Sequence, residues 1–303
     1  MIWMYAVRGN ELYAMDITSL RELNDSSSKV DWAWIDIFHP DEKESEIISE
    51  LLGNEPRIVE DVKMQCTRNP SKIRTMYEKL HDYVLLSIPS VRFKEQLRIC
   101  PIFMIVKDKM LITWGEEQEH GHSMIIKSAI RRFREHVEEG GQPNSSLAIG
   151  MLLREIAFKN SDVMLSIREA IDQIEEKSLK DAGKKHAMYS IFSLKRKIST
   201  IHRLLTTEKE IMLDINETMI PRIKLDEKAK SIVDNAIENI NREIDFIDSY
   251  NRSLDSILTL QDLASIHRVE SSINYLTIIL VVGTIILIIL ELMAKLGIFS
   301  GSH

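Results

Sequence analysis

The sequence predicts an α+β/α fold: an N-terminal α/β domain, a helical hairpin, and one very long helix that continues into a single C-terminal transmembrane helix. Three observations carry this prediction. Short strand patterns fill the first 115 residues, and apolar positions then recur at three- and four-residue steps. Near the end of the chain, Ser271 to Leu290 form a run of twenty residues without a charge.

Five segments of the N-terminal part are predicted strands, because they are short, rich in β-branched and aromatic residues, and bounded by turn signals. They are Ile2 to Val7, Trp32 to Phe38, Tyr83 to Val91, Ile99 to Val106 and Met110 to Trp114. The turn Lys107-Asp108-Lys109 joins the last two of these strands, which predicts that they form a hairpin. A helix is predicted over Asp41 to Leu52, because acidic residues follow Pro40 and apolar residues then follow at helical spacing.

The remainder of the chain is predicted to be almost wholly helical. Helical spacing runs through Leu147 to Leu179 and Met188 to Met212 with a break around Gly183, which indicates an antiparallel hairpin that Pro221 ends. From about Asp226 to Leu296 there is no proline, so one helix of about 105 Å is expected.

These patterns divide the chain into six predicted regions. They are a cytosolic α/β domain (1–137), a linker (138–146), an antiparallel helical hairpin (147–221), a long acidic stalk helix (222–270), a transmembrane helix (271–296) and a short tail (297–303).

The uncharged run is long enough to cross a bilayer. Twenty helical residues rise about 30 Å, the thickness of the hydrocarbon core. A buried core helix is the alternative, although such a helix usually keeps a polar stripe. His267 and Arg268 precede the run and Lys295 follows it, which favours a cytosolic N-terminal bulk and a short C-terminal tail across the cell (plasma) membrane. Charges at Arg8 and Glu11 argue against a signal peptide.

Charge and motif content exclude several function classes. Lys and Arg total 39 against 46 for Asp and Glu, and the net charge of −7 argues against nucleic acid and favours cationic partners. Cys66 and Cys100 are expected to be reduced structural thiols. No Walker loop, dinucleotide-binding turn or His-Glu-x-x-His motif occurs, so no enzyme is predicted. His120 and His122 are expected in a surface loop after Gly115.

Six motifs lie in an order that matches a known family. They are DWAWIDIFHP (Asp31 to Pro40), VEDV (Val59 to Val62), YEKLHDYVLLSI (Tyr77 to Ile88), MLITW (Met110 to Trp114), LKRKISTIHRLLTTEKEI (Leu194 to Ile211) and LTII (Leu276 to Ile279). Together they resemble the CorA family of divalent-cation channels. The resemblance implies a funnel-shaped homo-oligomer, a pentamer, that carries Mg²⁺ or Co²⁺ through the bilayer. It implies no tightly bound cofactor, with Mg²⁺ as the transported or regulatory ion.

The chain departs from that family at the outer end of the membrane helix. Members of the family end this helix with Gly-Met-Asn and add a second membrane helix, whereas the positions aligned on LTII here are Ala294, Lys295 and Leu296. The sequence therefore resembles an atypical member that lacks both features. The alternative hypothesis is a non-conducting, membrane-tethered scaffold or regulatory relative of CorA channels.

A row of polar residues marks one face of the predicted membrane helix. Glu270, Thr277, Thr284 and Glu291 are seven apart, so the row drifts by only about 20° per heptad. In a symmetric oligomer this face could line a pore with acidic rings and apolar constrictions. With the positions that the resemblance adds, the candidate pore-lining residues are Glu270, Ile273, Leu276, Thr277, Leu280, Thr284 and Glu291. Two alternatives stay open: threonines that bond their own backbone or a neighbouring helix, and glutamates at the lipid interface.

The helix before the membrane segment is acidic. From Leu213 to Asp262 there are eleven carboxylates and six basic side chains. By resemblance, carboxylates of neighbouring subunits could bind regulatory Mg²⁺, which takes oxygen ligands and keeps several waters. The candidates are Asp234, Glu238, Asp245 and Asp248, although Asn235 stands at the family's sensor position. A merely solvated helix face is the alternative.

Overall fold

The structure is a computed structural model that describes residues 2–15, 30–52, 59, 62, 76–79, 83–93, 96–115, 121–180 and 185–295. The chain forms two compact units. The sheet unit comprises Met1–Glu169 and Arg196–Tyr250, and the tail unit comprises Ala170–Lys195 and Asn251–His303. Each unit is described separately below.

A seven-stranded mixed sheet forms the N-terminal part of the sheet unit. Its strands are β1 (Ile2–Arg8), β2 (Glu11–Met15), β3 (Trp32–Phe38), β4 (Met76–Lys79), β5 (Val84–Phe93), β6 (Leu97–Lys107) and β7 (Met110–Gly115). They lie in the order β2-β1-β3-β7-β6-β5-β4. Only the central pair β3–β7 is parallel, and the other neighbours are antiparallel. The predicted hairpin is confirmed, because β6 and β7 pair from Lys107 opposite Met110.

The two faces of β3 pack against different helices. Ile35 and Ile37 share a buried cluster with Ile48 of helix α2 (Glu42–Leu51). Side chains alternate along a strand, so Trp34 points to the other face, where its ring lies 6.1 Å from that of Phe133 in helix α4 (Gly121–Glu138). The sheet is therefore covered by α2 on one face and by α4 on the other.

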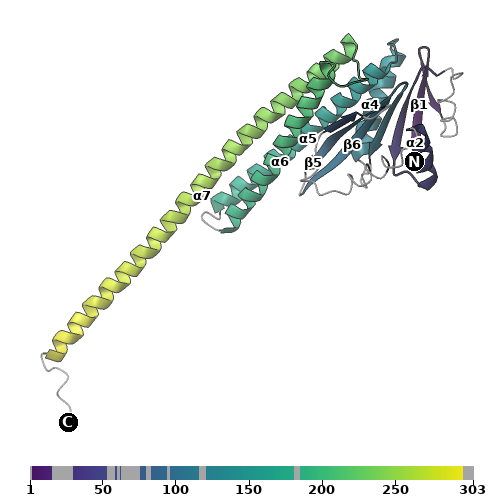
Figure 1. Ribbon diagram of the computed structural model, residues 1–303. Helices are drawn as coiled ribbons and strands as arrows, with labels where there is room; N and C mark the ends of the chain where they lie inside the picture. The colour runs from purple at the N-terminus through teal and green to yellow at the C-terminus, as the bar shows by residue number, and fades with distance from the viewer. Residues whose placement is uncertain are drawn as a thin grey trace. The chain divides into compact units, whose positions relative to one another are not determined.

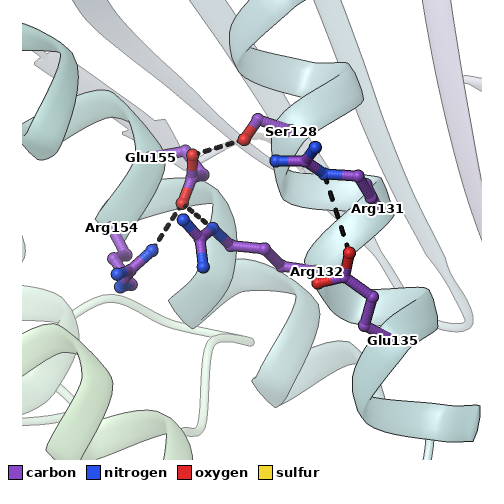
Figure 2. Close-up of polar contacts among 6 residues, drawn as sticks. All are labelled: Ser128, Arg131, Arg132, Glu135, Arg154 and Glu155. Atoms are coloured by element: carbon purple, nitrogen blue, oxygen red, sulfur yellow. Dashed lines mark hydrogen bonds and ion pairs between the residues drawn. The ribbon is translucent and has the colours of Figure 1, made fainter.

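Helix α4 is joined to helix α5 (Ser145–Lys180) by a small polar network (Figure 2). Glu155 of α5 accepts a hydrogen bond from Ser128 Oγ at 2.6 Å. The same carboxylate pairs with Arg132 Nε and Arg154 Nη1, each at 2.6 Å from Oε1. Because the Glu155 side chain is only 11 % exposed, these contacts fix the helix that covers the sheet to the helical part of the same unit.

Three long helices make up most of the rest of the described chain: α5, α6 (Lys185–Asn216) and α7 (Glu227–Lys295). In the sheet unit, α5 and α7 approach closely at Gly150, where an added Cβ would lie 3.3 Å from Ala229. Asp226 caps the start of α7, since its Oδ1 accepts from the amide of Ala229 at 2.8 Å. Figure 1 shows α5 and α6 as a hairpin.

The tail unit contains the far end of that hairpin and the second half of α7. Gln261 Nε2 donates to the carbonyl of Ser178 at 2.8 Å, and Lys195 pairs with Asp255. Leu254 and Ile257 in the same part of α7 are buried. Beyond Gln261, α7 is at most half-buried at every described residue and continues alone (Figure 1).

Several expectations about elements are corrected. The edge strands β2 and β4 and helix α4 were not predicted. His122 lies in the first turn of α4 and not in a loop, and His120 lies outside the described residues. Helix α6 ends at Asn216, before Pro221, because Thr218 adopts a left-handed φ of 62°. The amide of Met219 then bonds the carbonyl of Asp214 at 2.8 Å, which closes a Schellman motif.

Other expectations stay untested. The predicted domain boundaries remain predictions, as does the redox state of the cysteines. Cys100 lies on β6 opposite Ser90, and Cys66 lies outside the described residues.

Candidate functional site: the apolar end of helix α7

The apolar run predicted from the sequence lies inside helix α7 of the tail unit. Among the described residues, α7 is the one helix that is long and apolar enough to cross a membrane, judged by its length and composition. No part of its most apolar stretch is buried. Leu276 is 65 % exposed and Leu280 is 70 % exposed. A water-soluble protein rarely leaves so much contiguous apolar surface uncovered. This surface therefore requires lipid or another chain to cover it.

The candidate pore residues occupy neighbouring rows on that helix. At about 100° per residue, Glu270, Thr277, Thr284 and Glu291 form one slowly drifting row. A parallel row holds Ile273 and Leu280, displaced by about 60°. Leu276 lies about a further 60° around the helix and forms the edge of the candidate face. Within one chain, the structure thus places all seven residues on an arc of about 120°.

The two threonines bond their own helix. Thr277 Oγ1 donates to the carbonyl of Ile273 at 2.8 Å, and Thr284 Oγ1 donates to that of Leu280 at 2.7 Å. This is the backbone bonding that the sequence left open as an alternative. A hydroxyl has one proton and two lone pairs, so each threonine oxygen still offers an acceptor to its surroundings. Backbone bonding and a role as an oxygen ring are therefore compatible.

The glutamates at both ends of the row have local partners. Glu270 Oε2 lies 3.2 Å from His267 Nδ1, and Glu291 Oε1 lies 3.0 Å from Lys295 Nζ. All four side chains are more than 60 % exposed. Exposed pairs of this kind contribute about 0–1 kcal/mol, so another ligand can displace either partner.

The candidate regulatory carboxylates also share one face of α7. At about 100° per residue, Asp234, Glu238, Asp245 and Asp248 fall within an arc of about 80°, and all four are exposed. Asp234 Oδ1 accepts from Asn216 Nδ2 at 2.6 Å, and Asp248 lies 3.7 Å from His202. The described part of a single chain holds no group of three or more His, Cys, Asp or Glu side chains that could bind a metal. A metal on this face would need ligands from a second chain or from water.

Two carboxylates that sequence reasoning did not single out lie inside the sheet unit. Glu208 of α6 is 1 % exposed and Glu243 of α7 is 2 % exposed. A signal was present in the spacing, because Leu204 and Met212 flank Glu208 at core positions of the helix. Charged residues are seldom buried, so this spacing alone does not indicate a buried acid.

Taken together, the fold and the exposed helix define a class of protein in which an α/β domain is joined through long helices to a candidate membrane segment. A family model described as "CorA-like Mg2+ transporter protein" matches residues 29–286, and the chain belongs to that family. The members of this family are ion transporters and not enzymes, as expected from the motif content.

Solved structures share the fold. The complete CorA magnesium transporter from Methanocaldococcus jannaschii matches with a TM-score of 0.68 and 15 % identity, over 100 % of this chain and 87 % of that chain. The soluble domain of CorA from the same organism matches with a TM-score of 0.62 and 17 % identity, over 86 % and 96 % of the two chains.

A third similar structure is the cytoplasmic domain of ZntB from Vibrio parahaemolyticus RIMD 2210633. It matches with a TM-score of 0.59 and 13 % identity, over 88 % of this chain and 98 % of that chain. No curated protein matches the chain. At such low sequence identities, the similarity to these three structures shows that the fold is shared and nothing more.

Proposed function

We propose that this chain is one subunit of a homo-oligomeric membrane channel or transporter for divalent cations of the Mg²⁺/Co²⁺ type. The observation that carries the proposal is the exposed apolar end of α7 with a polar row on one side. A helix that only anchors a protein does not need such a row. A pore needs one, because ions must replace part of their hydration shell with oxygen ligands.

Assembly is part of the proposal, since a single helix cannot enclose a pore. Several copies must close around an axis along the membrane normal, with the polar row facing inward and the opposite face toward lipid. The resemblance to CorA channels favours five copies in a funnel. The N-terminal bulk would lie in the cytosol and the short tail on the other side of the plasma membrane.

In such an assembly each row becomes a set of rings. Glu270 would form an acidic ring at the cytosolic end and Glu291 one at the far end, where they concentrate cations. Between them, rings of Thr277 and Thr284 would offer hydroxyl oxygens, and Leu280 would form an apolar constriction. The acidic face of Asp234 to Asp248 would bind Mg²⁺ between neighbouring subunits and favour a closed state.

One observation favours a second candidate function, a non-conducting scaffold or regulator that keeps the oligomer. The CorA family has Gly-Met-Asn at the outer mouth, whereas Ala294, Lys295 and Leu296 stand at the aligned positions. A lysine at a cation entrance repels the ions that the channel should admit.

Flux separates the two functions. The purified chain is reconstituted in liposomes that hold a metal-sensitive dye, and Mg²⁺, Co²⁺ and Ni²⁺ are added outside. The channel function requires uptake above that of empty liposomes, and native mass measurement of the same sample must give an oligomer. An oligomer without flux would leave the scaffold, and a monomer in the membrane sample would exclude the channel.

A further inference from the structure

The sheet unit contains a buried polar layer between three helices, made of Asn160, Ser161, Glu208, Asn239 and Glu243. Asn160 Nδ2 of α5 donates to both carboxylate oxygens of Glu208 on α6, at 3.1 and 3.4 Å. The next residue of α5, Ser161, donates to Glu243 Oε1 on α7 at 2.8 Å. Because adjacent residues of α5 reach the two carboxyl groups, both lie at the same level of the helical bundle.

The two carboxyl groups have unequal surroundings. Glu243 Oε1 also accepts from Asn239 Nδ2 at 2.9 Å, and the guanidinium of Arg242 is nearby on the same helix. The second oxygen of Glu243, Oε2, is buried and has no hydrogen-bond partner. Among the residues that the structure describes, the amide of Asn160 is the one donor to Glu208. Glu243 is thus the better site for the negative charge, and Glu208 the better site for a proton.

Few charges of the described residues face this layer. Helix α5 contributes the uncharged Asn160 and Ser161, helix α6 contributes Glu208, and helix α7 contributes Glu243 and the exposed Arg242. The ion pair of His202 with Asp248 on the same helices has both side chains well exposed. Two ionised carboxylates in this layer would therefore repel each other without a buried cation between them, which is an expensive arrangement.

Burial acts on both acids in the same direction. Burial raises the pKa of Glu208 to about 8, the hydrogen bond from Asn160 opposes the shift, and the charge of Glu243 adds to it. Burial also raises the pKa of Glu243, to about 7, against hydrogen bonds from Ser161 and Asn239 and the charge of Arg242.

We propose that Glu208, held by Asn160 in the layer that also contains Glu243, is a buried proton-binding site, and that its protonation sets the stability of the bundle of α5, α6 and α7. The inference goes beyond transport and does not depend on it. The site would make this part of the protein sensitive to alkaline conditions, whatever ion the membrane helix handles.

The direction of the pH dependence follows from linkage. The pKa of Glu208 is about 8 when folded and 4.5 ordinarily, so between these pH values the folded state holds a proton that the unfolded chain has lost. The stabilisation is fully present below about pH 4.5 and is lost as the pH rises through about 8. The bundle should therefore weaken from mildly acidic to alkaline pH.

The test uses the full chain in detergent, with Glu208→Gln as the variant and Glu210→Gln as the control. Glu210 is an exposed carboxylate two residues along the same helix. We expect the Tm of the parent and of Glu210→Gln to fall as the pH is raised from about 5 to about 9. The glutamine at this position in Glu208→Gln cannot ionise, so the Tm of this variant should fall by about half as much as that of the parent, or less. Equal pH slopes in parent and Glu208→Gln would overturn the proposal.

A second measurement needs no variant and holds even if Glu208→Gln fails to fold. Infrared difference spectra of the parent between about pH 6 and about pH 9 should show the loss of a carbonyl-stretch band of protonated carboxylic acids. Ordinary carboxyl groups are already ionised over this range and give no such signal. The absence of the band from the parent would equally overturn the proposal.

Discussion

Arg132 Nε of helix α4 lies 2.6 Å from Glu155 Oε1 of helix α5, and this contact is the centre of the network between the two helices (Figure 2). Replacing Glu155 with Gln removes the charge that holds Arg132 and Arg154 in place. We expect the free energy of unfolding to fall by about 1–3 kcal/mol. Chemical denaturation of the full chain in detergent measures this loss.

Glu135→Gln is the matched control in the same pair of helices. Glu135 is paired with Arg131 at 3.8 Å, and both side chains are more than half exposed. The change should cost at most about 0.5 kcal/mol. If the two variants lost equal stability, the burial of Glu155 would have no energetic importance.

The close approach of α5 and α7 gives a second prediction. A Cβ added to Gly150 would lie 3.3 Å from the Cα, Cβ and carbonyl oxygen of Ala229. Gly150→Ala should be close to neutral, because the gain of about 0.5–1 kcal/mol in helix stability offsets the tight contact. Gly150→Val adds two further methyl groups to the same place and should lose about 1–3 kcal/mol. A valine variant as stable as the alanine variant would mean that the helices are farther apart.

The cap at the start of α7 gives a third prediction. Asp226→Ala removes the oxygens that accept from the amide of Ala229 at 2.8 Å and from Asn144 Nδ2 at 2.9 Å. The expected loss is about 1–2 kcal/mol in thermal or chemical unfolding. Asp226→Asn keeps an acceptor and should recover part of it. The capping bond is made by Asp226 and not by its neighbour Glu227, so Glu227→Gln should change stability by less than about 1 kcal/mol.

The sequence predicted the long helices well because their signals are redundant. Apolar spacing, the break around Gly183 and the absence of proline after Asp226 all point to the same elements, and α5, α6 and α7 are found there. The missed strands have weaker signals. β2 and β4 are five and four residues long and lie at the two edges of the sheet, where a strand needs few buried residues.

The end of α6 and the buried acids were missed for physical reasons that spacing does not report. A Schellman motif at Thr218 depends on a left-handed backbone that the sequence favours only weakly in a threonine. The burial of Glu208 depends on Asn160, which lies 48 residues away in the chain. For the candidate pore row, the sequence specifies which residues share a face, whereas the partner that covers this face is a property of the assembly.

Regulation by Mg²⁺ is the fourth prediction, and it rests on the acidic face of α7. If Mg²⁺ binds between native subunits, millimolar Mg²⁺ should raise the Tm of the oligomer and slow its proteolysis relative to chelator, by mass action. A variant with Asp234→Asn, Glu238→Gln, Asp245→Asn and Asp248→Asn should lose both effects.

A charge-matched control tests whether any four acidic side chains would produce the response to Mg²⁺. The variant Glu169→Gln, Asp172→Asn, Glu175→Gln and Glu176→Gln removes the same number of charges from helix α5 and should still respond to Mg²⁺. A parent protein that behaves identically in chelator and in excess Mg²⁺ would eliminate the regulatory site.

The last prediction distinguishes a pore from an anchor, and it uses Glu270. In a ring of five like charges, neighbours about 8 Å apart interact by roughly 2 kcal/mol at an effective dielectric constant of about 20, so the ring concentrates divalent cations at the mouth. A single glutamate that faces lipid headgroups produces no such field. Glu270→Gln should therefore lower cation flux by about tenfold or change its selectivity, without changing membrane insertion or oligomer size.

Glu291→Gln should act in the same way from the opposite mouth. The matched control is Ile278→Leu, since Ile278 lies about 80° from Glu270 on the side away from the candidate pore rows. This change keeps the volume and apolar character and should leave flux unaltered. If both glutamine variants conduct like a parent with robust flux, the row is not the permeation path, because ions that crossed it would pass both acidic rings.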